Sequence, residues 1–224
     1  MADPHVGVFL QGFFKTAPGG YGAGDRFRGI RVPVLRQFAR RHEQVTLTEA
    51  EALLQSPWHE DRLLALLILI RQYAKADTGR KAEIFALTLD NKRHINNWDL
   101  IDTFAPPIVG AHLANQDRSL LDRLAESSSL WDRRIAIIST FHFIRHDEFS
   151  DTLRLATILL TDKEDLIHKA VGWMLREVGK RDLQTEENFL QAHYRNMPRT
   201  MLRYAIEKFP EKRRQQYLCG EVGA

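Results

Sequence analysis

Cysteine is nearly absent from this sequence, in which Cys219 is the sole example. One thiol cannot form a disulfide within the chain. Nor can this chain alone build an iron–sulfur cluster or a multi-cysteine zinc site. This composition is typical of a protein of the reducing cytosol, and we expect a cytoplasmic location.

Long apolar runs are also missing. The longest is LLALLILI, residues 63–70, whereas a membrane-spanning helix needs about 20 apolar residues. The first residues, MADPHVGVFLQGFF, lack a basic stretch followed by a long apolar one, so no secretory signal is predicted. We expect no membrane partner.

Strand signals are equally scarce, since alternating runs of Val, Ile and Thr do not occur. Long segments instead place apolar residues at i, i+3, i+4 and i+7, the spacing of one face of an α-helix. These segments are EAEALLQS, DRLLALLILIRQYA, RKAEIFALTL, SLLDRLAES, RRIAIISTFHFI, DTLRLATILL, HKAVGWMLREVG and MLRYAIEKF. The sequence therefore predicts an all-α protein with short polar turns.

A weak repeat runs through the predicted helices. The small or aliphatic residues at the centre of every second helix are 36, 35, 34 and 35 residues apart, at Ala65, Ile101, Ala136, Ala170 and Ala205. A period of about 35–45 residues with two helices per unit is typical of TPR-like or HEAT-like repeats. The Trp-Leu-Gly-Tyr pattern of TPR repeats is missing, so HEAT-like repeats fit better. We expect one domain over residues 1–224, with a concave face.

Positive charge is mildly in excess, with a net charge of +3 and a pI of about 9.1. Residues 1–42 hold seven Lys or Arg against two Asp, and further basic clusters occur at 132–134, 179–181 and 211–214. Spaced basic clusters can each meet a phosphate of a nucleic-acid backbone. The alternative is a solvated helical surface.

Glycine gathers in one place, the segment KTAPGGYGAGDRFRGIRVP at residues 15–33, which also holds Tyr21. No Gly-Lys-Ser/Thr follows it, which excludes a Walker loop. No strand precedes it, which excludes a dinucleotide fingerprint. By itself it predicts a loop that connects two helices.

Trp98 and Asp102 stand four residues apart in NNWDLID, residues 96–102. On a helix, such residues share one face. A tryptophan is usually part of a core. An acid in an otherwise apolar turn is either a cap for the next helix or a sheltered functional carboxylate. These residues alone leave open whether the segment belongs to a core or to a working site.

Two later segments carry further candidates. Trp173 and Arg176 occupy adjacent turns of HKAVGWMLREVGK, which makes Arg176 a candidate phosphate ligand. SLWDRRIAI places Arg133 and Arg134 at the start of a helix, where pairing with Asp132 is the alternative to binding DNA.

Other catalytic signatures are weak. His142 and His146 have the i, i+4 spacing of a metal pair, but no glutamate follows His142 directly and no third ligand is evident. No G-x-S-x-G nucleophile elbow exists. We therefore expect no metal and no cofactor.

Five segments in order resemble one family, the AlkD-type DNA alkylation-repair glycosylases. They are FFKTAPGGYGAGDRFRGIRVPVLR (13–36), NNWDLID (96–102), LWDRRIAI (130–137), HKAVGWMLREVGK (168–180) and MPRTMLRYAIEKF (197–209). They are spread along nearly the whole chain at compatible spacing. The resemblance implies a single-domain right-handed solenoid of HEAT-like (ARM-type) repeats with a concave DNA-binding face, in agreement with the period read from the residues.

The resemblance also implies an activity: hydrolysis of the N-glycosidic bond of cationic alkylated purines, such as 3-methyladenine and 7-methylguanine, in duplex DNA without base flipping. The family's catalytic aspartate corresponds to Asp102, and its flanking tryptophans to Trp98 and Trp173. Its DNA-contacting arginine corresponds to Arg134, the second arginine of WDRR, and a further DNA contact to Tyr21.

The alternative function is a HEAT-like scaffold that binds DNA or protein without catalysis, because a fold alone does not give function. Release of free base from damaged duplex separates the two. We expect a cytoplasmic monomer whose partner is double-stranded DNA carrying alkylated bases.

Overall fold

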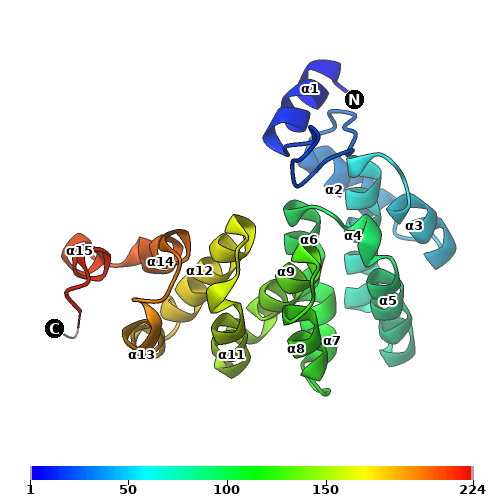
Figure 1. The fold of residues 1–224 in the computed structure, drawn as a ribbon. Coiled ribbons are helices and arrows are strands. Elements are labelled where there is room, and N and C mark those ends of the chain that lie inside the picture. Colours follow the sequence, from blue (N-terminus) through cyan, green and yellow to red (C-terminus); the bar gives the residue numbers. More distant parts are fainter. Residues whose placement is uncertain (1, 223–224) are drawn as a thin grey trace. The chain divides into compact units, whose positions relative to one another are not determined.

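All regular structure in the described part of the chain is helical (Figure 1). A computed structural model describes residues 2–222. Within that range the sole β-type pairing is an isolated bridge between Arg26 and Trp58. The all-α helical-repeat fold predicted from the sequence is confirmed.

The chain divides into two compact units, with the division after His112. The single domain over residues 1–224 stays a prediction. The elements of unit 1 are α1 (Pro4–Phe13), α2 (Val32–Arg41), α3 (Leu47–Leu54), α4 (His59–Lys75), α5 (Thr78–Asp90), the 3₁₀ turn η1 (Lys92–His94), α6 (Trp98–Phe104) and the π-helical η2 (Ala105–Gly110).

The short α7 (Ala111–Leu113) lies at the division, and unit 2 follows it. Its elements are α8 (Ser119–Ala125), α9 (Leu130–Ser139), α10 (Phe141–Ile144), α11 (Ser150–Ile158), η3 (Leu159–Thr161), α12 (Asp165–Gly179), α13 (Leu183–His193), α14 (Arg199–Ala205), η4 (Ile206–Lys208) and α15 (Glu211–Cys219).

The five repeat positions read from the sequence all lie in the core. Each is at most 1% exposed and falls on α4, α6, α9, α12 or α14 in turn: Ala65, Ile101, Ala136, Ala170 and Ala205. Small side chains at these points let neighbouring helices approach. The predicted period therefore marks the buried helix of each successive pair.

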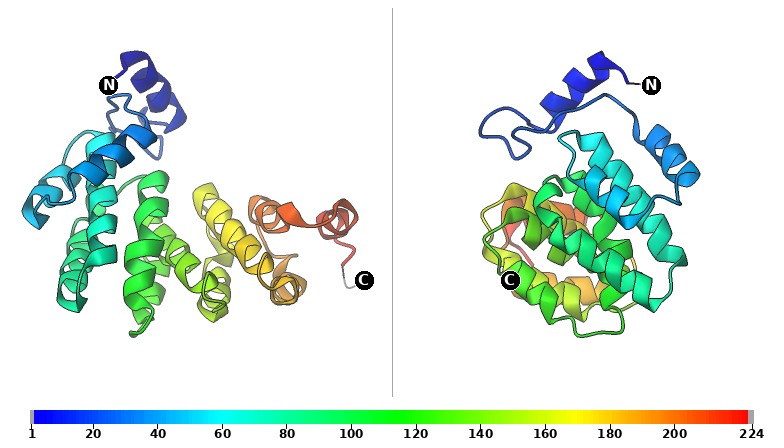
Figure 2. Two further views of the ribbon diagram at one scale, coloured as in Figure 1. Left: turned by 180° about the vertical axis from the view of Figure 1, so that it is seen from behind. Right: turned by 90° about the vertical axis from the view of Figure 1, so that its right-hand side faces the viewer.

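Each unit is built around one long helix. In unit 1, α4 packs against α2, α3 and α6, and in unit 2, α12 packs against α9, α13 and α14. The packing of α12 against α14 needs Gly172, because a Cβ there would lie 2.4 Å from the carbonyl oxygen of Met201 on α14. Figure 2 shows the loop between α1 and α2 running beside the N-terminal end of α4.

Side-chain caps define several helix starts, because an oxygen at the N-cap accepts from a backbone N–H that has no partner within the helix. The capping residues are Asp3, Thr46, Asp77, Asn97, Ser129 and Asp182. Thr46 and Glu49 form a reciprocal capping box.

One predicted helix is divided in two. The segment RRIAIISTFHFI forms the end of α9 and all of α10, with the break at Thr140. The hydroxyls of Ser139 and Thr140 donate to the carbonyls of Ile135 and Ile137, at 2.6 and 2.7 Å. Hydroxyl bonds of this kind compete with the helical ladder and bend helices.

Candidate functional site

Helix α6 has one core face and one partly exposed face. Leu100, Ile101 and Phe104 are fully buried. Trp98 and Asp102, four residues apart, are both only partly buried. The tryptophan ring and the carboxylate therefore share the face that a ligand can reach.

Helix α6 changes its winding three residues after Asp102. From Ala105 the chain continues as the π-helical η2, which contains Pro106 and Pro107. Proline has no backbone N–H, so neither residue can donate the usual helical bond to the carbonyl four residues back, at Asp102 and Thr103. Such π-helical turns are rare, and those that do occur are often found at functional sites.

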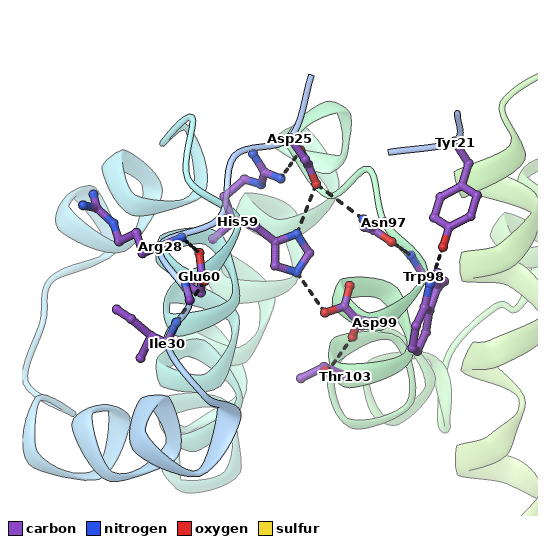
Figure 3. Close-up of polar contacts among 12 residues, drawn as sticks. Tyr21, Asp25, Arg28, Ile30, His59, Glu60, Asn97, Trp98, Asp99 and Thr103 are labelled. Carbon is purple, nitrogen blue, oxygen red and sulfur yellow. Dashed lines mark hydrogen bonds and ion pairs between the residues drawn. The ribbon is translucent and has the colours of Figure 1, made fainter. Parts of the chain in front are cut away.

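Aromatic side chains surround Trp98. Its ring centroid lies 5.4 Å from that of Phe14 and 6.1 Å from that of Phe13. Its indole N–H donates to the Tyr21 hydroxyl at 3.3 Å (Figure 3). That hydroxyl donates to the carbonyl of Phe13, also at 3.3 Å. The structure thus brings together Tyr21 and Trp98, which the sequence separates by 77 residues.

The glycine-rich loop connects α1 to α2, as predicted, and its glycines let it pass close to its neighbours. A Cβ at Gly22 would lie 2.4 Å from the carbonyl oxygen of Phe14 and 3.3 Å from the Asn97 side chain. Gly29 has a φ of +77°, and a Cβ there would meet the carbonyl of Asp3 at 1.9 Å. Larger residues at either point would push the loop away from α6 or α1.

Two acidic anchors hold this loop on unit 1. At its end, the Glu60 carboxylate accepts the backbone N–H groups of Arg28, Gly29 and Ile30 at 2.8–3.2 Å. In its middle, Asp25 accepts from Arg62 at 2.5 Å and from Asn97 at 3.4 Å. Asp25 also meets Nδ1 of His59.

His59 stands between two carboxylates (Figure 3). Its Nδ1 lies 3.1 Å from Asp25 and its Nε2 lies 2.8 Å from Asp99; these three residues form the His59 bridge. Burial works against charge on His59, yet its hydrogen bonds to both carboxylates raise its pKa above the usual value. Burial also works to raise the pKa of Asp25, but the bonds from His59 and Arg62 bring it below its usual value.

The His59 bridge was missed in the sequence. Its members lie 34 and 40 residues apart, so no local spacing indicates it. The histidine follows a tryptophan in SPWHED, where a helix-starting polar residue is the ordinary interpretation.

In unit 2, Trp173 and Arg176 are both tied to carboxylates. The Trp173 indole N–H donates to Glu177 at 3.0 Å, and the ring packs beside Phe141 with centroids 5.8 Å apart. Arg176 pairs with Glu207 and lies 3.6 Å from Glu177. These contacts fix both side chains on the face of α12 that carries Glu177.

The two arginines of WDRR have different settings. Arg134 is 5% exposed and donates to the carbonyl of Leu166 at 2.6 Å. Arg133 uses all three of its donor nitrogens within unit 2, on Asp162 and on the carbonyls of Ser127 and Ser128. A contact of Arg134 with DNA stays a prediction.

The histidine pair does not form part of a metal cluster. The rings of His142 and His146 lie 4.6 Å apart, and His146 Nδ1 is 2.8 Å from the carbonyl oxygen of His142. Among residues 2–222, no group of three or more His, Cys, Asp or Glu side chains is placed to hold a metal ion. None of the helices in the same range is both long and apolar enough to cross a bilayer.

Fold and site together define an all-α helical-repeat protein that presents a tryptophan and a carboxylate on one helix face. Comparison with known families gives its membership: the chain belongs to the DNA alkylation repair enzyme family, whose model matches residues 1–209. The predicted family is confirmed, and with it a role in DNA alkylation repair.

A solved structure shares the fold. It is described as a predicted DNA alkylation repair enzyme from Enterococcus faecalis, and it superposes with a TM-score of 0.73 over 94% of this chain and 98% of that one. The identity is 18%, so this likeness concerns the fold alone. No curated protein matches the sequence.

Proposed function

We propose that this protein is a DNA glycosylase that hydrolyses the N-glycosidic bond of cationic alkylated purines in duplex DNA. The observation that carries the proposal is the shared, partly exposed face of Trp98 and Asp102 on α6, in a chain of the DNA alkylation repair family. The substrates are of the 3-methyladenine and 7-methylguanine type, and the base stays stacked while it is cut.

Asp102 acts on the sugar. Breaking an N-glycosidic bond develops positive charge on the deoxyribose, as in glycoside hydrolysis. A fixed carboxylate facing that charge lowers the barrier and can position the attacking water. An alkylated purine is already cationic and leaves without protonation, so the reaction needs no general acid.

The tryptophans act on the same positive charge. The faces of aromatic rings carry negative quadrupole density and attract cations. Trp98 is fixed by Tyr21 and Phe14, so its ring needs no reorganisation when the substrate binds. Trp173, fixed by Glu177, is proposed to flank the substrate in the same role. Arg134 and Arg176 are proposed to contact phosphates.

The test is release of free base. The protein is incubated in excess with duplex containing 7-methylguanine, and free base and abasic sites are measured over time. We expect both to appear with wild-type protein, and to appear about 10²–10³-fold more slowly with the Asp102→Asn variant. Asp90→Asn, which alters an exposed carboxylate of α5 in the same unit, should release base like wild type.

The same assay can reject the proposal. If the wild type binds damaged duplex but releases no base, the protein is a scaffold. If Asp102→Asn releases base as fast as Asp90→Asn does, the activity belongs to another residue or to a contaminating glycosylase.

A further inference from the structure

The His59 bridge is unusual because both nitrogens of one imidazole face a carboxylate. The side chain of His59 is 2% exposed, that of Asp25 is 3% exposed, and that of Asp99 is 19% exposed. Phe27 stacks on the ring with centroids 4.5 Å apart, and Phe14 lies at 5.1 Å. Water therefore has little access to the imidazole.

This geometry favours a doubly protonated ring. A neutral imidazole carries one N–H and one lone pair, so it can donate to only one of two carboxylates. Its lone pair would then face the other carboxylate, at 2.8 or 3.1 Å. An imidazolium donates to both carboxylates. Hydrogen bonds between an ionised donor and an ionised acceptor are stronger than neutral ones.

Charge balance leads to the same state. The charged groups acting on the imidazole are Asp25 from the loop and Asp99 from α6, while Arg62 from α4 pairs with Asp25. Two carboxylates and one guanidinium leave one net negative charge beside the buried imidazole, and protonated His59 cancels it. An uncompensated buried charge is strongly destabilising.

The bridge joins the elements of the candidate site. Asp25 lies in the loop that carries Tyr21, and Asp99 lies in the first turn of α6, next to Trp98 and three residues before Asp102. Asn97, which caps α6, also donates to Asp25. His59 itself is the first residue of α4. A loop and two helices thus meet at one ring.

We propose that His59 is a positioning residue, an imidazolium that ties the Tyr21 loop to the first turn of α6 and so sets the orientation of Trp98 and Asp102. Its effect on base excision rests on the proposed function, whereas its protonation and its hold on Trp98 do not. When His59 loses its proton, one carboxylate loses its donor and the loop can shift relative to α6.

The sign of the pH effect follows from the direction of the pKa shift. Because the pKa of His59 is raised in the folded protein, its stabilisation is full below the ordinary histidine value of about 6.5. It is lost as pH rises through the folded value. Raising the pH through the folded value should therefore loosen the contact between Tyr21 and Trp98.

The first experiment reads the protonation state directly. Long-range ¹H–¹⁵N spectra of the free protein are recorded as pH rises, and the His59 signals are assigned by their loss in His59→Gln. We expect both ring nitrogens to stay protonated above the ordinary titration range of histidine. In Asp99→Asn the amide can donate to Nε2, so His59 should titrate at lower pH than in wild type.

The second experiment monitors the position of Trp98. Its indole N–H resonance should titrate with the same midpoint as His59 and shift in His59→Gln, while that of Trp173 in unit 2 serves as the unaffected control. In single-turnover assays, His59→Gln should lower the excision rate roughly 10–100-fold, as expected for a displaced catalytic group. Affinity for undamaged duplex should change less than about twofold, because no phosphate ligand is altered.

Three results would overturn the proposal. They are a singly protonated His59 ring at neutral pH, a Trp98 resonance that ignores both pH and His59→Gln, and an unchanged midpoint in Asp99→Asn. If His59→Gln does not fold, the wild-type and Asp99→Asn titrations still decide. A wild type that releases no base at any pH rejects the glycosylase instead, and leaves these resonances as the test of His59.

Discussion

Each unit places a tryptophan and a carboxylate four residues apart on one helix, yet the two pairs form different hydrogen bonds. In unit 2, the Trp173 N–H donates to Glu177, which also binds Lys180 at 2.7 Å and lies 3.6 Å from Arg176. In unit 1, the Trp98 N–H donates to Tyr21 instead of to Asp102. The same spacing therefore gives the two tryptophans different hydrogen-bond acceptors.

The difference suggests a division of roles. The Glu177 carboxylate accepts from the Trp173 indole and from Lys180 and lies beside Arg176, so Glu177 serves to orient the Trp173 ring. In unit 1 a tyrosine orients the Trp98 ring, and the Asp102 carboxylate is not used for that purpose. We infer that Asp102 supplies charge to the reaction and that Glu177 supplies structure.

Exchanging each acid for its amide tests this division most strongly. Asp102→Asn should lower the single-turnover excision rate by about 10²–10³, the usual loss for one preorganised electrostatic contact. Glu177→Gln should lower it by less than about 10-fold, because an amide oxygen can still accept from the indole. Equal losses in the two variants would refute the division of roles.

The buried acids of the two units also differ, and pH should separate them. Asp25 in unit 1 is paired with His59 and Arg62. Glu186 in unit 2 is 2% exposed, and its Oε1 is buried without a hydrogen-bond partner among the described residues. Burial, with repulsion from Glu187, raises the pKa of Glu186 to about 8.

A raised acid pKa means that the folded state holds a proton that the unfolded state has lost. Stability should therefore fall as pH rises from about 4.5 to about 8. Glu186→Gln removes this penalty, and it should increase the free energy of unfolding by up to about 5 kcal/mol at pH 9 and by less than about 1 kcal/mol at pH 5. Urea unfolding at both pH values measures it.

Exposed Glu126, in the same unit, provides the control for that measurement. Glu126→Gln should change stability little at either pH. A gain from Glu186→Gln that is equal at pH 5 and pH 9 would mean that Glu186 is ionised in the folded protein at both.

The two tryptophans should differ in their contribution to stability. Trp98 contacts Phe13, Phe14 and Tyr21, so Trp98→Ala should cost about 2 kcal/mol, roughly half the loss for a fully buried ring. Trp173→Ala, which loses Phe141 and the bond to Glu177, should cost less. Thermal melts compare the two, and single-turnover assays on 7-methylguanine duplex should show reduced excision in both.

These measurements also decide whether the two tryptophans are core residues or substrate-contacting residues. If excision falls only in proportion to the folded fraction, the rings are core residues. If excision falls in folded protein, and falls more for cationic 7-methylguanine than for a neutral damaged base, the rings contact the substrate.

The contrast between the units also shows where sequence reasoning works. Periodicity located the buried helices, because Ala65 and Ala136 obey a spacing that the helix itself imposes. The helix-connecting role of the glycine-rich loop followed from its composition. The shared face of Trp98 and Asp102 followed from the same helical spacing.

The sequence does not predict the contacts that fix these side chains. Tyr21 meets Trp98, and His59 meets Asp25 and Asp99, across 34 to 77 residues. Such pairs depend on tertiary packing, for which helical periodicity carries no information. The π-helical turn after Asp102 had a local signal in its two prolines, but helix termination would have left the same signal.

The smallest expected effect concerns the adjacent arginines of α9. Binding to undamaged duplex should weaken as salt rises, since each phosphate contact releases counterions. Arg134→Ala should flatten the slope of log affinity against log salt by about one unit. Arg133→Ala should leave that slope unchanged and lower the melting temperature, because it takes the guanidinium away from nearly buried Asp162.

An unchanged slope in Arg134→Ala together with a flatter one in Arg133→Ala would assign the phosphate contact to Arg133. It would also mean that Arg133 exchanges Asp162 for DNA when the duplex binds.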